Sequence, residues 1–183
     1  MTKSENQEEL LLVLDDDGNS TNKLEKRSIV HNELLWHNEI ALWILNPENK
    51  SILLQRRSAS KKSNPNKLAL CMGHVSGFDT LEETAIREAQ EELGIDISIY
   101  PIKKLLTTRA KNNTNHCFSH HFYIVANIQV SDITVQTEEL SEVLYMNYEE
   151  FKSKLHSGDS ELAFRNHKIY DQIFEEFDKI FLN

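Results

Sequence analysis

The sequence predicts an α+β fold in which helices pack against a mixed β-sheet. The chain has 183 residues, a length that suits one structural unit with a sizeable core. Hydrophobic residues make up 39% of it and charged residues 27%, an ordinary balance for a globular protein. Strand-like segments come first, with helical segments inserted among them and gathered at the end. This order favours a layered sandwich over a doubly wound parallel sheet.

The N-terminal part predicts a small β extension. Residues 1–9 are polar and acidic, and we expect a loose tail there. Residues 10–14 are apolar and lead into Asp15-Asp16-Asp17-Gly18-Asn19, which predicts a strand ending in a tight turn. Residues 22–32 predict a second short element that closes this module.

The next segments predict a hairpin and a short strand. Residues 36–45 and 51–57 flank the turn signal Asn46-Pro47-Glu48-Asn49, which favours a β-hairpin. Residues 58–67 form a polar, basic stretch and are expected to be a loop. Residues 68–72 are apolar and predict another strand. The remaining patterns predict strands over 95–106, 117–130 and 143–146, and helices over 148–155 and 161–181.

A central helix is predicted over residues 81–93. Leu81, Ala85, Ala89 and Leu93 recur at spacings of four, which gives the helix one apolar stripe. Thr80 and Glu83 fit a capping box before it, and Gly94 fits its end.

Composition excludes some classes of partner. The formal net charge is −9, which argues against a broad nucleic-acid or membrane surface because both are anionic. The N-terminus has no basic start followed by an apolar run, so we expect no signal peptide and a cytoplasmic protein. Cys71 and Cys117 are expected to be free thiols. An acidic protein of this kind can still bind a phosphate compound if a divalent metal lies between them.

Three carboxylates on the central helix indicate such a metal site. Glu91 and Glu92 lie three and four positions beyond Glu88, so all three share one side of the helix. Like charges this close destabilise a bare helix, whereas Mg²⁺ prefers oxygen ligands and binds through a few carboxylates. The alternative is a charged, solvated helix face, which is the commoner source of glutamate clusters.

The stretch from Gly73 to Ile95, GHVSGFDTLEETAIREAQEELGI, resembles the Nudix box, G-x5-E-x7-R-E-U-x-E-E-x-G-U, in which U is a bulky aliphatic residue. Arg87, Glu88, Glu91, Glu92 and Gly94 match it at the right spacing. The departures are Asp79 in place of the first Glu and Ala89 in place of the aliphatic residue. Neither removes an expected metal ligand.

The resemblance extends over about residues 8–155. Leu35-Trp36-His37 and Gln55-Arg56-Arg57-Ser58 are similar to the Nudix branch related to isopentenyl-diphosphate isomerase. It implies a Nudix-type α/β/α sandwich with a mixed sheet and a short N-terminal β extension. We accordingly divide the chain into an extension, residues 1–30, packed on a domain, residues 31–183.

The resemblance leaves a choice between activities. The isomerases carry a catalytic Cys where this chain has Met72, and Met cannot move a proton. Cys71 is one residue away, but on a strand that shift points the side chain to the opposite face. Hydrolysis of a diphosphate linkage in a nucleoside diphosphate derivative or a similar metabolite is therefore expected. The alternatives are an isomerase-like enzyme and a catalytically silent ligand-binding module.

For hydrolysis, the resemblance implies Mg²⁺, which Mn²⁺ can replace, held by Glu88, Glu91 and Glu92. Arg87 is expected to orient a box carboxylate. The general base can come from the box, as Glu91 or Glu92, or from a later loop containing Glu138, Glu139 and Glu142. We name Glu142 as the candidate there, and a solvated acidic loop is the alternative.

Basic side chains near the box are candidates for substrate binding. Arg56, Arg57 and Lys61 could hold phosphate oxygens, with surface solubility as the alternative role. His74 follows the opening glycine and is expected to line the pocket. The expected partner is a small diphosphate substrate. A homodimer is one alternative for the assembly, and the sequence leaves the oligomeric state open.

Overall fold

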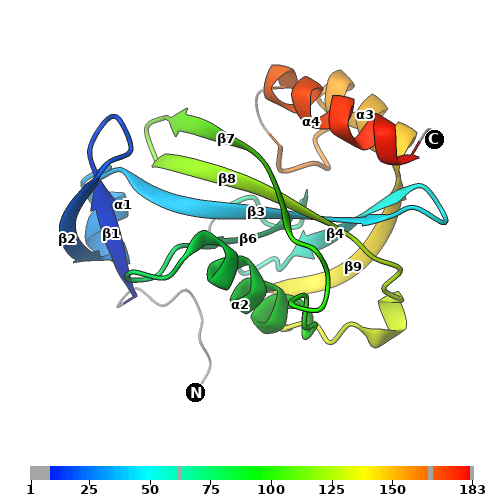
Figure 1. Cartoon of the computed structure of the whole chain (residues 1–183), viewed down its shortest axis with the longest axis horizontal. Coiled ribbons are helices and arrows are strands. Elements are labelled where there is room, and N and C mark those ends of the chain that lie inside the picture. The colour runs from blue at the N-terminus through cyan, green and yellow to red at the C-terminus, as the bar shows by residue number, and fades with distance from the viewer. Residues whose placement is uncertain (1–8, 62, 165–166, 182–183) are drawn as a thin grey trace.

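The computed structural model describes residues 9–61, 63–164 and 167–181, and it has three layers (Figure 1). A mixed sheet lies in the middle. Helix α2, Leu81–Leu93, packs on one face of the sheet. Helices α3, Tyr148–Ser157, and α4, His167–Phe181, pack on the other. The predicted α/β/α sandwich is confirmed.

The central sheet contains seven strands in the order β5-β4-β3-β8-β7, with β6 paired to β3 and β9 paired to β4. Strands β3 and β8 are parallel, and the other pairs are antiparallel. The strands are β3 His37–Asn46, β4 Ser51–Arg57, β5 Leu68–Ala69, β6 Cys71–His74, β7 Lys103–Lys111, β8 His116–Val125 and β9 Leu140–Asn147.

Strands β3 and β4 form a hairpin only beside its turn. They pair at Leu45 with Ile52 and at Asn46 with Ser51, and then separate. Beyond that point β3 pairs with β8 and β6, while β4 pairs with β9 and β5. Both strands are almost wholly buried, so each needs sheet neighbours to satisfy its backbone along its length. The turn signal predicted the connection correctly but not this separation.

Several strand boundaries differ from the prediction. The strand expected over 95–106 begins only at Lys103, and Ile97 is buried from a non-strand segment. The apolar pattern of this segment therefore reflects the burial of its side chains and not pairing with another strand. The strand expected over 68–72 is divided into β5 and β6 at Leu70. The helix expected from residue 161 is described from His167, and residues 165–166 lie outside the described part of the chain.

A small module precedes the sheet. Strand β1, Leu10–Leu14, pairs with β2, Ser20–Lys26, and helix α1, Arg27–Asn32, follows. The second element expected over 22–32 is therefore a strand end and a short helix. Leu11, Val13 and Val30 form a separate cluster of buried side chains. Of the tail expected over residues 1–9, only Glu9 lies within the described residues.

The module joins the domain through backbone hydrogen bonds at both ends of β1. Leu14 N donates to Trp36 O over 2.8 Å, at the start of β3. Gly77 N donates to Leu10 O over 2.7 Å. Gly77 lies in the loop that enters α2, so the module contacts the segment that leads into the glutamate-bearing helix.

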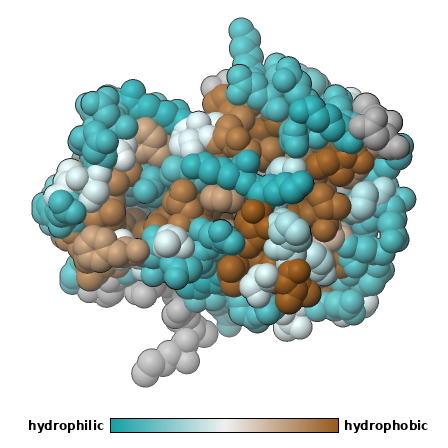
Figure 2. All heavy atoms as spheres, viewed as in Figure 1, coloured by the Kyte–Doolittle hydropathy of each residue, from teal (hydrophilic) through white to brown (hydrophobic). Residues whose placement is uncertain are grey.

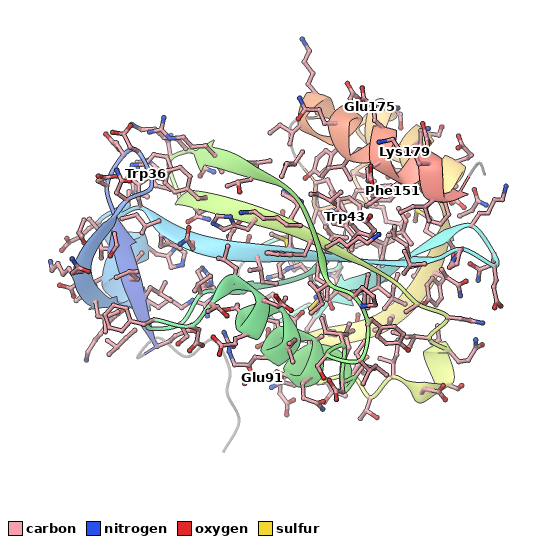
Figure 3. All side chains as sticks on the ribbon, in the orientation of Figure 1. Trp36, Trp43, Glu91, Phe151, Glu175 and Lys179 are labelled. Carbon is pink, nitrogen blue, oxygen red and sulfur yellow. The ribbon has the colours of Figure 1, made fainter. Side chains whose placement is uncertain are left out.

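Side chains of β3 point alternately to the two faces of the sheet, so this strand contributes to the core on both sides. Ile40, Leu42 and Ile44 face α2, whereas Ala41, Trp43 and Leu45 face α3 and α4. The Trp43 ring lies 5.8 Å from that of Phe151 and 5.3 Å from that of Phe177 (Figure 3). These aromatic contacts fix the C-terminal helices to the sheet.

The outer surface is mostly hydrophilic on the side shown in Figure 2, with hydrophobic side chains visible in places. Phe78 and Ile99 are the most exposed large hydrophobic residues described. Among the described helices, none is long and apolar enough to span a membrane.

Helix α2 has the ends that the sequence predicted. Thr80 Oγ1 accepts from Glu83 N, and the Glu83 carboxylate accepts from Thr80 N, which completes the capping box. The helix ends at Gly94, which adopts φ 68° in the left-handed region. A side chain at Gly94 would also crowd Thr134. Both ends are thus fixed by local chemistry.

Replacing Thr80 with Ala should lower the free energy of unfolding by about 1 kcal/mol, because the first turn of α2 loses its capping oxygen. Urea unfolding of the metal-free protein measures this. Thr80→Ser keeps the oxygen and should stay close to the wild type. Equal losses in both variants would mean that the methyl group, rather than the cap, stabilises the helix start.

Candidate active site

Glu88 lies directly beneath Gly73 of β6. A Cβ atom added at Gly73 would overlap the Glu88 side chain at Cγ, Cδ and Oε1. The glycine is therefore required by space, because its missing side chain leaves room for a carboxylate against the strand. This contact explains why the box opens with glycine fifteen residues before Glu88.

Arg87 lies between two of the box carboxylates. Its Nη1 donates to Glu88 Oε1 over 2.7 Å and lies 3.6 Å from Glu91 Oε2. Its Nη2 donates to the carbonyl oxygen of His74 over 3.1 Å. Asp79, the departure from the motif, has Oδ2 3.8 Å from Arg87 Nε. Arg87 thus connects α2 to the end of β6 and donates to Glu88.

Glu92 lies deeper than the other two carboxylates and has a different partner. It is only 8% exposed, and its Oε2 accepts from Gln55 Nε2 over 2.7 Å. Gln55 belongs to β4 and was not predicted as a site residue. The side chain of Glu91 is 35% exposed and extends from α2 (Figure 3). The three carboxylates share one side of the helix, yet each has its own environment.

Burial raises the proton affinity of two box carboxylates. It raises the pKa of Glu88 to about 8, and the negative charge of Glu92 adds to the effect. It raises the pKa of Glu92 to about 7, although the Gln55 hydrogen bond opposes this. Buried carboxylates that repel one another, with space kept open by Gly73, fit a hard divalent cation bound through oxygen. These residues therefore suit Mg²⁺.

The predicted basic residues separate onto two faces of the sheet. Arg57 shares the α2 face with Gln55, donates Nε to Ser63 O over 2.9 Å, and lowers the pKa of Glu92 by its charge. Lys61 forms an ion pair with Glu139, whose charge raises the pKa of Glu92. Arg57, Lys61 and Glu139 therefore lie around the deep end of the box.

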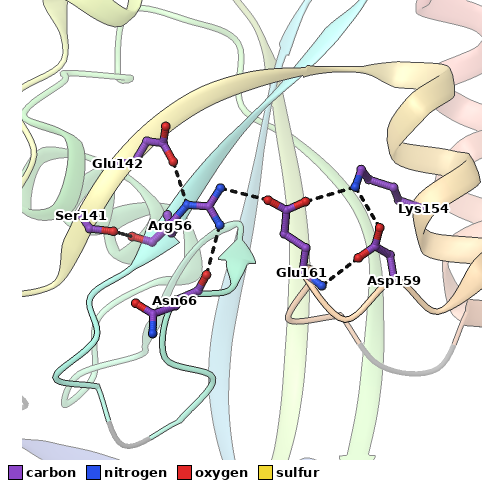
Figure 4. Close-up of polar contacts among 7 residues, drawn as sticks. All are labelled: Arg56, Asn66, Ser141, Glu142, Lys154, Asp159 and Glu161. Atoms are coloured by element: carbon purple, nitrogen blue, oxygen red, sulfur yellow. Dashed lines mark hydrogen bonds and ion pairs between the residues drawn. The ribbon is translucent and has the colours of Figure 1, made fainter.

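Arg56 points to the opposite face of β4, away from α2 (Figure 4). Its Nε donates to Glu142 over 2.7 Å, its Nη2 to Glu161 over 3.0 Å, and its Nη1 to Asn66 O over 3.1 Å. Glu142, opposite it on β9, shares that face. The structure therefore brings Arg56 and Glu142 together and separates both from α2.

His74 belongs to a cluster of three imidazoles that joins the module to the sheet. Its Nε2 lies 3.1 Å from Nε2 of His31 in α1. One ring nitrogen from each of His31, His37 and His74 lies within 4.8 Å of the others. His37 uses Nδ1 to donate to Leu35 O over 3.0 Å, and its buried Nε2 has no hydrogen-bond partner among the described residues.

The cluster has the chemistry of a second cation site. Burial lowers the pKa of His37 to about 4 and that of His74 well below its usual value, so both rings are neutral at pH 7. Neutral imidazole is the form that binds Zn²⁺ and similar ions. The sequence did not reveal the group, because its members come from α1, β3 and β6 and share no local spacing.

The metal-free protein should lose stability as pH rises from about 4.5 to about 8. The pKa values of Glu88 and Glu92 are raised in the folded state, so the folded protein binds more protons than the unfolded chain in this range. The contribution is present at low pH and lost as pH passes about 8. Thermal unfolding in a chelator measures it. Glu88→Gln should flatten the profile, and an unchanged slope in that variant would contradict the assignment.

Co²⁺ should bind the histidine cluster and show the visible absorption of an imidazole-bound ion. His37→Asn should abolish this signal, because Nε2 of His37 is the buried ligand with no other partner. Glu91→Gln, which alters only the box, should retain it. A signal that survives His37→Asn but disappears in Glu91→Gln would show that Co²⁺ prefers the box.

Comparison with known proteins places this geometry in a family. The sequence matches the NUDIX domain over residues 35–165. It is 29% identical over 169 residues to an uncharacterized Nudix hydrolase of Listeria innocua, covering 86% of this chain and 90% of that protein. It is 31% identical over 161 residues to Nudix hydrolase 3 of Arabidopsis thaliana, covering 83% of this chain but only 21% of that protein.

Isomerases and solved structures also appear among the relatives. The isopentenyl-diphosphate Delta-isomerase of Salmonella paratyphi B is 30% identical over 149 residues, 80% of each chain. The crystal structure of DR0079 from Deinococcus radiodurans has a TM-score of 0.69 at 18% identity and covers 94% of this chain and 99% of its own. The NUDIX domain of Shewanella oneidensis NrtR, complexed with ADP ribose, has a TM-score of 0.59 at 16% identity, covering 76% and 86%. With a matching domain over most of its length and the box geometry intact, the chain belongs to the Nudix family of hydrolases.

Proposed function

We propose that the protein hydrolyses the diphosphate linkage of a nucleoside diphosphate derivative or a similar small metabolite in a Mg²⁺-dependent reaction, in which Mn²⁺ can replace Mg²⁺. The observation that carries this proposal is the placement of Glu88. It lies buried against Gly73 and is held by Arg87, beside Glu91 and Glu92. A helix used only for packing gains nothing from buried carboxylates that repel one another.

Glu88, Glu91 and Glu92 would hold the cation. When bound, it offsets the charge of the diphosphate and lowers the pKa of a coordinated water. Arg87 fixes the direction of Glu88 and keeps Glu91 close, so the carboxylates need little rearrangement. Arg57 and Lys61 supply positive charge near Glu92 for phosphate oxygens, and His74 borders the same edge through β6.

We assign proton acceptance from the attacking water to Glu91. Among the three box carboxylates it has the most exposed side chain, so it can reach a water and release the proton to solvent. Glu142 is the other candidate from the sequence. Its ion pair with Arg56 on the far face of the sheet makes it a weaker base for a reaction beside α2. A loss of activity in Glu142→Gln equal to that in Glu91→Gln would reverse this assignment.

The nucleotide part of the substrate class is supported by analogy. The NUDIX domain of NrtR was solved with ADP ribose, which contains a nucleoside diphosphate. The similarity to isopentenyl-diphosphate isomerases instead supports a smaller diphosphate as the substrate class. The resemblance noted in the sequence places Met72 where the isomerase branch has its catalytic cysteine, so hydrolysis remains the proposal for this chain.

A Mg²⁺-dependent screen over nucleoside diphosphate derivatives and prenyl diphosphates tests the function. The wild type should release a phosphate product, and Glu92→Gln should lower the rate by about 100-fold or more, since it removes a charged ligand from the site. Glu149→Gln, on the exposed first turn of α3, is the matched control and should keep full activity.

Other outcomes of the screen separate the competing functions. A product isomeric with its substrate would establish an isomerase. Tight binding without turnover at any divalent ion would establish a ligand-binding module. Wild-type activity in Glu92→Gln would contradict the metal assignment even if hydrolysis is observed.

A further inference from the structure

In the buried amide of Gln55, the nitrogen donates a hydrogen bond, whereas the oxygen has no partner among the described residues. Gln55 is 2% exposed, near the end of β4 on the face that α2 covers. Its Nε2 donates to Glu92 Oε2 over 2.7 Å. Its Oε1 is buried and accepts no hydrogen bond from the described residues. Leaving a buried acceptor without a donor is unfavourable, so such an atom calls for a functional explanation.

We infer that Gln55 is a positioning residue for the cation site: it orients Glu92 through a neutral donor, and its free Oε1 accepts a hydrogen bond from a water on the bound cation. This inference rests on the proposed function, because it needs a cation at the box. Both amide atoms belong to one planar group, so Oε1 stays beside the carboxylate that Nε2 holds. Cation-bound waters are strong donors and need acceptors of this kind.

The side chain that donates to Glu92 is uncharged, whereas the side chain beside Glu88 and Glu91 carries a positive charge. Glu88 and Glu91 share the guanidinium of Arg87, which offsets part of their charge. Glu92 accepts a hydrogen bond from the Gln55 amide instead, and this donor holds the carboxylate without adding a positive charge. Gln55 therefore holds Glu92 without a charge of its own that would compete with the cation. A lysine in place of Gln55 would hold the same carboxylate but compete with the cation, and an apolar residue would remove the amide donor and leave only the Cys71 thiol beside the carboxylate.

Binding of Mn²⁺ to the full chain tests the inference, with electron paramagnetic resonance as the readout. Gln55→Met keeps the volume and removes the donor and the acceptor. Gln55→Lys keeps a donor and adds a charge. Both should weaken Mn²⁺ binding by about 10- to 100-fold, the range typical for residues that support metal ligands. At saturating Mn²⁺, hydrolysis by Gln55→Met should recover most of its kcat, because the reacting groups are intact.

Two further variants serve as controls for the Mn²⁺ binding experiment. Glu92→Gln identifies the part of the Mn²⁺ signal that comes from the box rather than from the histidine cluster. Thr84→Val removes another buried polar side chain from α2, one that bonds only the Thr80 carbonyl oxygen. It should alter thermal stability and leave Mn²⁺ affinity within about twofold, because the hydrogen bond of its hydroxyl goes to the backbone and not to a box carboxylate.

The outcomes are distinguishable. Weaker Mn²⁺ binding in Gln55→Met, with Thr84→Val unchanged, supports the positioning role. Wild-type affinity in Gln55→Met, with or without lower stability, would overturn it and leave Gln55 as a packing residue. If Gln55→Lys does not fold, Gln55→Met still decides. If the wild type shows no signal that depends on Glu92, the proposed function itself fails, and this role for Gln55 fails with it.

Discussion

Glu88 lies against the backbone of Gly73 in space that a single methyl group would fill. This contact determines how the rest of the site is arranged. It brings the carboxylate side of α2 under β6, and it places Arg87 within reach of the His74 carbonyl oxygen. Because the sheet and helix approach so closely here, Glu88 and Glu92 are shielded from water, and this burial raises the pKa of both side chains.

The three carboxylates divide the supporting contacts among different elements. Arg87 belongs to α2 itself, whereas Gln55 reaches Glu92 from β4. The separation of β3 from β4 after the first pairs is what allows β6 and β4 to flank the same helix. A continuous hairpin would occupy the edge of β3 that β6 uses. The irregularity in the sheet and the polar contacts of the site are thus parts of one arrangement.

The sequence alone predicted those features that depend on residues close together in the chain. Thr80, Glu83 and Gly94 fix the ends of α2 from within a few residues, so both boundaries were predicted correctly. The box spacing likewise identified the carboxylates and Arg87. Arg56 and Arg57 are neighbours on one strand, so alternation alone puts them on opposite faces, but only their contacts in the structure show which of them lies on the α2 face.

Contacts between segments far apart in the chain could not be predicted from sequence patterns. Gln55 meets Glu92 across 37 positions, and His31 meets His74 across 43. Neither pair has a spacing that sequence periodicity can reveal. The strand expected from residue 95 was misplaced for a related reason: Ile95 and Ile97 pack against the core from a loop, and burial alone produces the same apolar pattern as a strand.

The two-stranded module leaves one side of β2 open, since β2 pairs only with β1 among the described strands. An open strand edge is a template on which another chain can add a strand. Here the edge carries mostly polar side chains that are largely exposed, and Asn22 adopts φ 58°, close to the register shift between Val13 and Leu14. A polar, irregular edge is a poor surface for strand addition.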